Sequence, residues 1–445
     1  MTDTARQSFP GNMPNAYQPG KGNLPPEDEA LVARRQKALG PAYRLFYETP
    51  VHLVRGEGVW LYDTAGKAYL DTYNNVASVG HCHPHVVAAT ARQSAVFASH
   101  TRYLHEGVLG YAERLLAHFP GELSHVMFTC TGSEANDLAF RIARAQTGGT
   151  GFIVTENAYH GVTYAIAGMS PSLGAGVDLG EHVRVVPAPK SGPETGPETG
   201  AEFAKGVQAA IRDMQRHGIK PAALIVDTVF SSDGVFADPA GFLAPAVAAI
   251  RAAGGLFIAD EVQPGFGRTG DAMWGFQRHG VLPDMVSLGK PMGNGYPVAG
   301  LVIQPRVLEA FGSKARYFNT FGGNAVAAAT ALAVLEVVEN EGLMQNARAV
   351  GGAFADGLRG LAKDHAPLGE LRAVGLFLGQ DIVDGEGQPD AKKAGWIVNR
   401  LREEGVLISA TGPKGHVLKI RPPLVFSPEN VAFFLERLER VLKTG

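Results

Sequence analysis

The sequence predicts an α/β protein in which a large, mostly parallel sheet is covered by helices on both faces and joined to a smaller α+β domain. Apolar residues make up 45% of the 445 residues and charged residues 19%, which is enough apolar material for a large buried core. From residue 126 onward, continuous apolar runs alternate with helical patterns, as in parallel sheets that are buried on both faces. Both chain ends carry short strand patterns, so we expect them to build the smaller domain together.

The N-terminal stretch predicts a polar arm, one charged helix and a few short strands. We expect an arm over residues 1–40, with a helix at 27–39, and then the first part of the smaller domain over 41–95. The strands of that part are expected at 51–54, 59–62 and 68–73, with turns between them that contain glycine. This spacing is typical of an antiparallel or edge region.

The middle of the chain predicts a large domain over residues 96–330. Its strands are expected at 126–130, 151–155, 224–229, 256–259, 285–288 and 298–303. Its helices are expected at 133–146, where apolar residues recur at helical spacing, and at 242–253. The repeat SGPETGPETG at 191–200 has no apolar face, so it is expected to be a surface loop.

The C-terminal stretch is expected to complete the smaller domain over residues 331–445. The predicted elements are helices at about 324–338, 392–404 and 427–443, and strands at 376–382, 406–409 and 416–420. The last helix has a favourable start, because Ser427 can cap it, Pro428 suits its first position and Glu429 lies in its first turn.

Charge and cysteine content exclude several classes of function. The net charge of −3 leaves no overall basic field for nucleic acid or an anionic membrane. Cys82 and Cys130 are the only cysteines, so we expect no disulfide framework and a cytoplasmic location. The N-terminus lacks the apolar core of a signal peptide, and Arg251 and two glycines interrupt the apolar stretch 242–260. We therefore expect no nucleic-acid partner and no membrane span.

Glycine is the residue type in clear excess, with 56 of 445 residues against a usual share of about 7%. No G-X-Y period accompanies it, which excludes a collagen-like chain. The excess indicates either tight loops or places where the backbone approaches something closely.

A carboxylate and a lysine follow two of the expected central strands. Asp260 ends the run LFIAD, and Lys290 follows the run SLG thirty positions later. Open α/β folds bind their ligands at the carboxyl ends of strands, where both side chains would lie. Desolvation lowers the pKa of an amine beside an apolar strand end, as a Schiff-base lysine requires. On spacing alone, a surface ion pair explains the pattern equally well.

The start of the helix expected at 133–146 is a candidate anion site. Free amides and the positive end of the helix dipole at Gly132 and Ser133 favour a phosphate. An ordinary strand-to-helix connection with a serine cap explains these residues equally well.

Two further segments add weaker signals. Tyr159 and His160 follow another strand end, and Tyr159 can stack on a flat heterocycle. Thr320 precedes the long apolar helix and can donate its hydroxyl to a phosphate. Each residue alone also suits a packing role, but together the four segments supply a lysine, a carboxylate, an aromatic plate and a phosphate cradle.

These residues resemble the class III aminotransferase family of pyridoxal-phosphate enzymes, which have fold type I. The similarity runs from about Tyr43 to the C-terminus. It is carried by three segments that occur in the family's order, namely IADEVQPGFGRTG at 258–270, LGKPMGNGYPVAG at 288–300 and FNTFGGN at 318–324. The resemblance implies pyridoxal 5′-phosphate as the cofactor and a homodimer with its active sites at the interface.

The resemblance also implies a role for each position. As catalytic residues, Lys290 would form a Schiff base with the cofactor and move the proton, and Asp260 would pair with the pyridine nitrogen. The other cofactor-binding residues would be Tyr159 and Val262 around the ring, Gln263 at its phenolic oxygen, His160 beside it, and Gly132, Ser133 and Thr320 at its phosphate. In this family the residue at Thr320 usually comes from the partner subunit.

Two other motifs have simpler explanations. Residues 265–270 fit the dinucleotide pattern G-x-G-x-x-G, but they do not link a strand directly to a helix, so we expect an active-site loop. The run HCHPH at 81–85 crowds its ligands too closely to surround one tetrahedral ion, and it resembles the family's usual helix start. We expect no metal.

The cofactor residues do not decide between two reactions. Transamination passes the amino group of a primary amine or amino acid to a keto acid, and its prevalence in the family puts it first. The segments 74–84, 102–105 and 417–423 are especially similar to the ethanolamine-phosphate and hydroxylysine-phosphate phospho-lyases. The alternative is therefore β-elimination of phosphate and ammonia from a phosphorylated amino alcohol such as phosphoethanolamine. Such a lyase should hold an extra cationic cluster around the substrate's far end.

Arg421 is the expected residue for a substrate anion, because a guanidinium can bind a carboxylate or a phosphate through two hydrogen bonds. A surface or interfacial salt bridge is the alternative. Many members have a glutamate that pairs with this arginine, whereas the strand here ends in the shorter Asp227, so the usual carboxylate switch is expected to differ or be absent. Asn75 and Tyr103 are expected to line the substrate pocket, although both also suit packing.

Overall fold

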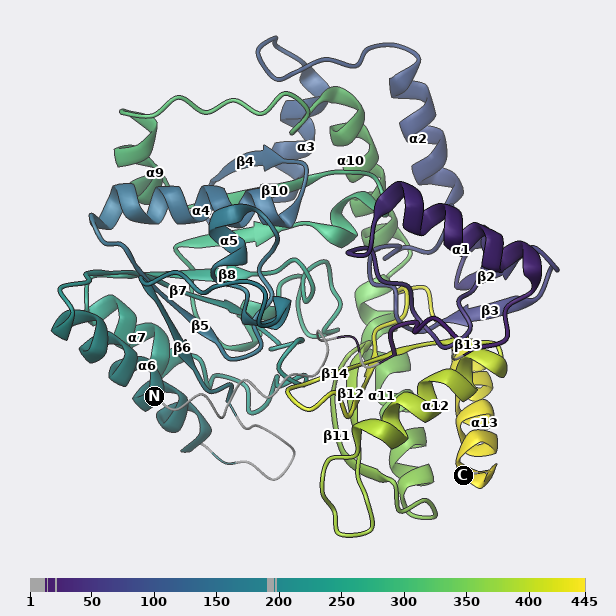
Figure 1. The fold of residues 1–445 in the computed structure, drawn as a ribbon. Coiled ribbons are helices and arrows are strands. Elements are labelled where there is room, and N and C mark those ends of the chain that lie inside the picture. The colour runs from purple at the N-terminus through teal and green to yellow at the C-terminus, as the bar shows by residue number, and fades with distance from the viewer. Residues whose placement is uncertain (1–12, 14, 21, 190–195, 197, 445) are drawn as a thin grey trace.

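The computed structural model describes residues 13, 15–20, 22–189, 196 and 198–444. A seven-stranded sheet with helices on both faces forms one side of the molecule, and two four-stranded sheets with their own helices form the other (Figure 1). The chain therefore has the mixed α/β architecture that the sequence predicts.

The large sheet is mostly parallel, as expected. Its order is β4 (His125–Thr129), β10 (Ala299–Ile303), β9 (Met285–Leu288), β8 (Leu256–Asp260), β7 (Pro221–Asp227), β5 (Gly151–Thr155) and β6 (Val183–Val186). Only β10 runs against its neighbours β4 and β9, while the pairs from β9 to β6 are parallel. Six strands therefore end at one edge of the sheet, and the beginning of β10 joins them there.

Side chains alternate between two apolar cores on the two faces of this sheet. On β7, Leu224 and Val226 enter one core, while Ala223 and Ile225 enter the other. The first face is covered by α3 (Glu106–Leu116), α6 (Glu198–Arg216), α7 (Ala244–Ala252) and α10 (Ala325–Asn340). The second face is covered by α4 (Gly132–Thr147), α5 (Tyr164–Ala167) and α9 (Pro305–Gly312). Burial of both faces explains why these strands read as continuous apolar runs.

A third apolar core joins the two ends of the chain. It includes residues of β3 (Ala68–Asp71) and α2 (Pro84–Ser94) as well as of α11 (Leu343–Ala362), α12 (Ala391–Glu403) and α13 (Pro428–Thr444). One small sheet has the order β1 (Leu53–Glu57), β2 (Trp60–Asp63), β3 and β13 (Val406–Leu407), and the other has the order β11 (Leu368–Val374), β12 (Phe377–Ile382), β15 (Val417–Ile420) and β14 (Ser409–Thr411). The domain limits at residues 40, 95 and 330 stay predictions.

Several predicted ends agree closely with the structure and others do not. As expected, α13 starts at Pro428, and Ser427 Oγ accepts a hydrogen bond from the backbone amide of Asn430. The helix expected at 27–39 is α1 (Pro26–Leu39). Strand β7 ends at Asp227 rather than at 229, because the chain turns there and Asp227 accepts the amide of Val229. Short pieces that were not predicted include α5, β6, α8 (Gly275–Arg278) and two 3₁₀ turns, Pro171–Leu173 and Lys290–Gly293.

The prediction of a loop at 191–200 is wrong for its last residues. Helix α6 begins at Glu198, and Thr199 and Gly200 are buried, Gly200 against the backbone of Phe242. The repeat therefore runs into a helix that continues far beyond it. Residues 190–195 and 197 lie outside the described residues.

No helix in the described part of the chain is both long and apolar enough to cross a membrane. The apolar stretch 242–260 is divided between α7 and strand β8.

Candidate active site

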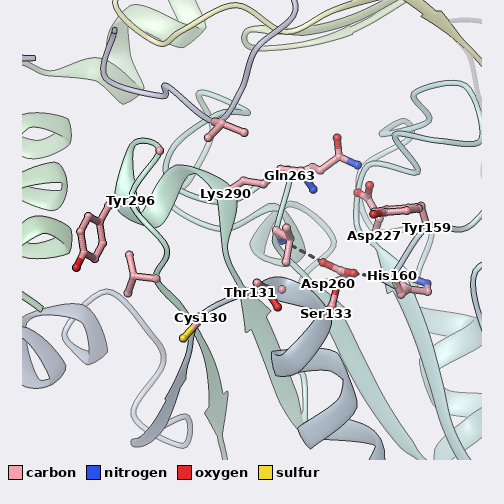
Figure 2. A pocket seen from close by; sticks show the side chains of 16 residues that line it. Cys130, Thr131, Ser133, Tyr159, His160, Asp227, Asp260, Gln263, Lys290 and Tyr296 are labelled. Carbon is pink, nitrogen blue, oxygen red and sulfur yellow. Dashed lines mark hydrogen bonds and ion pairs between the residues drawn. The ribbon is translucent and has the colours of Figure 1, made fainter. Parts of the chain in front are cut away.

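The carboxyl ends of five strands surround one cavity of about 260 Å³ (Figure 2). Its wall includes most of the predicted cofactor-binding residues, namely Gly132, Ser133, Tyr159, His160, Asp260, Val262, Gln263 and Lys290, together with Asp227. These side chains come from the ends of β4, β5, β7, β8 and β9. The reversed strand β10 contributes Val298 just before its first residue.

Lys290 follows β9 in a strained backbone conformation. Its φ is +29°, in a region that residues with a Cβ rarely adopt. Nζ lies 5.9 Å from the centre of the Tyr159 ring, on the cavity side. Burial lowers the pKa of the Lys290 amine to about 8, and the positive charge of Arg421 acts in the same direction. The amine is therefore easier to deprotonate than an exposed lysine, as a nucleophile requires.

Asp260 is held in place by three donors. Its Oδ2 accepts from Asn136 Nδ2 at 2.9 Å and contacts His160 Nδ1 at 2.8 Å, while its Oδ1 accepts from the amide of Val262 at 3.1 Å. Figure 2 shows Asp260 between His160 and the start of α4. The carboxylate thus has a fixed direction at the floor of the cavity, and Nε2 of His160 is buried without a protein partner among the described residues.

The start of α4 forms a cradle for an anion. A capping box closes it, in which Thr131 Oγ1 accepts the amide of Glu134 at 3.1 Å and Glu134 Oε2 accepts the amide of Thr131 at 2.9 Å. The first amides of the helix have no acceptor within the helix itself and border the cavity. A Cβ at Gly132 would lie 2.8 Å from Val262 Cγ2, so only glycine leaves this space open.

These features fit pyridoxal phosphate. The cradle at Gly132 and Ser133 suits its phosphate, Asp260 suits a protonated ring nitrogen, and Tyr159 and Val262 border the space between them. Lys290 Nζ supplies the amine that binds its aldehyde.

A second cavity of about 700 Å³ opens from the first one. It shares Tyr159, Gln263 and Lys290 with the cofactor cavity and extends to Lys419 and Arg421. Arg44 and Tyr73 also line it. Among the described residues, no aspartate or glutamate lines this cavity, which is therefore a positively charged space next to the amine of Lys290.

Arg421 is buried and bound by neutral or aromatic groups. Its Nη1 donates to Gln263 Oε1, and its guanidinium lies 4.3 Å from the centre of the Tyr73 ring. Its Nε is buried with no protein partner in the described part of the chain. Asp227 accepts from Ser231 instead of pairing with this arginine. The direct carboxylate partner that many family members have is therefore missing at the described residues.

Two further cations lie around Arg421, and the sequence analysis did not single them out. Lys419 is buried, and burial together with the charge of Arg421 holds the pKa of its amine well below the usual value. Arg268 is fully buried, and burial lowers its pKa to about 9, again with a contribution from Arg421. Its Nη1 donates to the carbonyls of Leu376 and Pro422. A signal for Lys419 was present, because residues two apart in a strand point to the same face.

Three predicted site residues lie away from both cavities of their own chain. Thr320 is exposed in the loop before α10. Tyr103 is 65% exposed and stacks on His100, with ring centres 5.1 Å apart. Asn75 is buried next to Val76, which lines the cofactor cavity, and its Nδ2 has no partner among the described residues. The roles of these three residues stay predictions.

The HCHPH run disperses its histidines over different acidic partners. His81 contacts Asp71 at 2.7 Å, His83 contacts Glu341 at 3.1 Å and His85 contacts Glu336 at 2.6 Å. Helix α2 begins within the run, at Pro84. The described residues contain no group of histidine, cysteine and acidic side chains that could hold a metal ion.

Comparison with known proteins adds a family and several relatives. The family model described as aminotransferase class-III matches residues 46–442. An alanine–glyoxylate aminotransferase 2-like protein of Drosophila melanogaster is 39% identical, with 91% of this chain and 85% of that protein aligned. An ethanolamine-phosphate phospho-lyase homolog 1 of Caenorhabditis elegans is 35% identical, with 93% of each chain aligned.

A solved structure resembles this chain over almost its whole length. It is a phospholyase from Arthrobacter in complex with phosphoethanolamine, with a TM-score of 0.90 and 42% identity. The alignment covers 93% of this chain and 100% of that one.

Proposed function

This chain belongs to the class III aminotransferase family, and on that premise we propose that it is a phospho-lyase that eliminates phosphate and ammonia from a short phosphorylated amino alcohol. The family's cofactor is pyridoxal 5′-phosphate, which the cavity around Lys290 and Asp260 fits. The sequence alone put transamination first. The cationic substrate cavity is the observation that reverses this order.

Lys419 and Arg421 carry the proposal because they supply the cationic cluster that a phosphate ester requires. Both are buried, and neither has a carboxylate hydrogen-bonded to it among the described residues. Burial disfavours the charged form of Lys419, and the negative charges of Asp227 and Asp233 offset this only in part, so a bound dianion would stabilise the charged form. Phosphate provides two negative charges and several acceptors for a guanidinium and an ammonium. Phosphoethanolamine would place its amine at Lys290 and its phosphate at Lys419 and Arg421, since these three residues line the same cavity.

Lys290 and Asp260 would carry out the proton transfer of the reaction. Bound pyridoxal phosphate supplies an electron sink that acidifies the carbon next to the substrate nitrogen. With a pKa of about 8, the Lys290 amine is deprotonated near neutral pH to a larger fraction than an exposed lysine, and the deprotonated amine can take that proton at Nζ. The three donors to Asp260 keep its carboxylate directed at the position of the ring nitrogen.

The substrate cavity would assist the departure of the leaving group. When the carbon–oxygen bond breaks, its electron pair leaves with the phosphate oxygen, and the electron pair of the deprotonated carbon forms a carbon–carbon double bond. Water then hydrolyses the released enamine to ammonia and an aldehyde. The charges of Lys419 and Arg421 stabilise the phosphate as that negative charge grows. Arg268, buried behind the Arg421–Pro422 segment, raises the positive potential further.

Transamination remains the second candidate, and two observations favour it. Arg421 also suits the carboxylate of an amino acid or a keto acid, and a relative named as an aminotransferase is 39% identical. Transamination needs only one anion site, however, and so does not explain why Lys419 is buried beside Arg421.

Product analysis of the purified holoenzyme separates the two reactions. The enzyme is incubated with phosphoethanolamine and with simple amines, each with and without pyruvate, and phosphate and alanine are assayed. We expect phosphate release from phosphoethanolamine without any keto acid. Alanine formation from the amines, with no phosphate released from phosphoethanolamine, would overturn the proposal in favour of transamination.

We also propose a homodimer whose active sites lie at the interface. The loop that carries Thr320 exposes Phe321, and Phe318 contacts Arg102, next to the exposed Tyr103 and Leu104. An exposed group of large apolar side chains favours a protein–protein contact at this place. The two unpaired cysteines, Cys82 and Cys130, favour the cytoplasm as the location.

A further inference from the structure

Arg421 reaches a buried carboxylate only through two neutral side chains. Its Nη1 donates to Gln263 Oε1, Gln263 Nε2 donates to Ser231 Oγ, and Ser231 Oγ donates to Asp227 Oδ2. Ser231 is fully buried, and Gln263 and Arg421 are each only 7% exposed. The chain of hydrogen bonds therefore runs from the cationic cavity through the protein interior to the end of β7.

The two ends of this chain fix the direction of every hydrogen bond in it. A guanidinium can only donate, so the oxygen of the Gln263 amide must face Arg421. The Gln263 amide nitrogen then faces Ser231, whose hydroxyl accepts from it and must direct its own hydrogen elsewhere. Asp227 receives that hydrogen and also accepts the backbone amides of Val229 and Ser231. Only one arrangement satisfies all four side chains at once.

We propose that Ser231 positions Arg421 through Gln263 and thereby makes the guanidinium a permanently available anion-binding group. This inference rests on the proposed phospho-lyase function and adds a specificity residue to it. A carboxylate in direct contact with Arg421 would compete with the substrate anion. Ser231 and Gln263 hold the arginine without that competition, because they contribute no charge.

A fixed arginine suits an enzyme that binds the same anion in every turnover. Tyr73 lies against the guanidinium, and Gln263 holds Nη1, so Arg421 is restrained by two different elements. The buried Nε is left for a ligand. An aminotransferase must instead bind two different substrates in turn at one site. An arginine that can move out of that site suits this task better.

Removal of the Ser231 hydroxyl tests this positioning role. In the holoenzyme, Ser231→Ala should raise the KM for phosphoethanolamine about three- to tenfold, the range expected for one lost hydrogen bond, and change kcat less than that. The dissociation constant of inorganic phosphate, measured by calorimetry on the holoenzyme, should rise by the same factor. Ser231→Thr keeps the hydroxyl and should restore both values.

Ser287→Ala is the matched control. Ser287 is a fully buried serine on β9 whose hydroxyl has no partner among the described residues, so the same substitution should leave the KM and phosphate binding unchanged. Unchanged phosphate affinity in Ser231→Ala, or a loss in Ser231→Thr as large as in Ser231→Ala, would overturn the inference. If Ser231→Ala fails to fold, Gln263→Glu tests the same chain, because a carboxylate beside Arg421 should weaken phosphate binding.

Two measurements distinguish a failure of this inference from a failure of the proposed function: phosphate release by the wild type and phosphate affinity of the Ser231→Ala variant. If the wild-type enzyme releases no phosphate from phosphoethanolamine, the proposed function fails. Loss of phosphate affinity in Ser231→Ala together with normal phosphate release by the wild type supports both. Normal release by the wild type with unchanged affinity in the variant rejects the positioning role alone.

Discussion

Lys419, which we propose to bind the substrate phosphate, is easily overlooked in the sequence beside the more conspicuous Arg421. The segment 417–421 directed attention to Arg421, because arginine is the familiar partner of carboxylates and phosphates. Lys419 lies two positions earlier on β15, and its amine is buried with no carboxylate bound to it among the described residues. Strand periodicity places both residues on one face, but the sequence does not reveal that this face borders a cavity.

We expect Lys419→Met to separate function from stability. Loss of one charge-assisted contact should lower kcat/KM for phosphoethanolamine about ten- to a hundredfold. The unfolding midpoint should stay the same or rise, because the variant replaces a buried amine, whose charged form is disfavoured by burial, with an apolar side chain. Lys363→Met is the matched control. Lys363 is exposed, so this variant should keep the wild-type kcat/KM. Wild-type kinetics in Lys419→Met would remove the residue from the site.

Two buried acids outside the reacting groups predict a pH dependence of stability. Burial raises the pKa of Asp233 and that of Glu261 to about 7, although hydrogen-bond donors oppose the change. Asp233 accepts from Thr155 Oγ1 at 2.8 Å and from the amide of Asn157 at 2.9 Å, at the base of the loop that carries Tyr159. In the unfolded chain both acids ionise near pH 4, so the folded protein binds more protons between pH 4 and 7.

The free energy of unfolding should therefore fall as the pH rises through this range. Asp233→Asn carries no ionisable group and should reduce the fall, which urea denaturation at about pH 4.5 and about pH 7.5 would measure. At the lower pH, wild type and variant should differ by less than about 1 kcal/mol, because the protonated acid and the amide make similar hydrogen bonds. An unchanged pH dependence in Asp233→Asn would show that Asp233 is ionised throughout.

At the scale of elements, the sequence predicts the strands and the helix around the cofactor cavity better than the helices that pack on the outside. Strand β9 agrees with its prediction at both ends, β8 is longer by one residue at its C-terminal end, and α4 is longer by one residue at each end. The 20-residue helix α11 and the helix α6 were not predicted. Several glycines weaken the helical pattern of α11, and one of them has a tertiary reason. A Cβ at Gly351 would lie 2.1 Å from the carbonyl oxygen of Gly375, so a long-range contact determines this residue.

The start of α4 supports a direct test of cofactor binding. Gly132→Ala places a methyl group 2.8 Å from Val262 Cγ2, at the mouth of the anion cradle. We expect the dissociation constant of pyridoxal phosphate to rise at least about tenfold, which titration of the cofactor-free protein would measure. Gly110→Ala in α3 is the control, because nothing lies within 4 Å of its added Cβ, and it should bind the cofactor normally. Equal affinities would place the phosphate elsewhere.

At the scale of the whole molecule, the sequence could not predict which distant strands pair, nor in which direction. It predicted a mostly parallel sheet, and the structure confirms this, but no local pattern showed that β10 runs against its neighbours. The expected contribution of both chain ends to the smaller part is visible in the shared core of β3, α11, α12 and α13. Thr320 and Tyr103 are exposed and lie away from both cavities, so the sequence did not predict their surroundings within one chain.

A complementation experiment tests the proposed dimer. Lys290→Ala and Thr320→Ala should each be nearly inactive as homodimers, and borohydride should fix no cofactor to the Lys290→Ala chain. If each site combines Lys290 of one chain with Thr320 of its partner, mixed dimers contain one intact site. Refolding equal amounts together should then restore about a quarter of wild-type activity, given random pairing. No recovery in the mixture, with the dimer confirmed by sedimentation, would place Thr320 at its own chain's site or at none.

The parallel pairing of β3 with β13 sets an order of assembly during synthesis. Leu70 pairs with Val406, so the N-terminal strands leave the ribosome long before their partner is translated. All seven strands of the large sheet emerge in that interval, and the cofactor cavity can form on the nascent chain. Lys419 and Arg421 follow only after β13. The residues that fit the cofactor are therefore translated before Lys419 and Arg421, the residues proposed to bind the substrate anion.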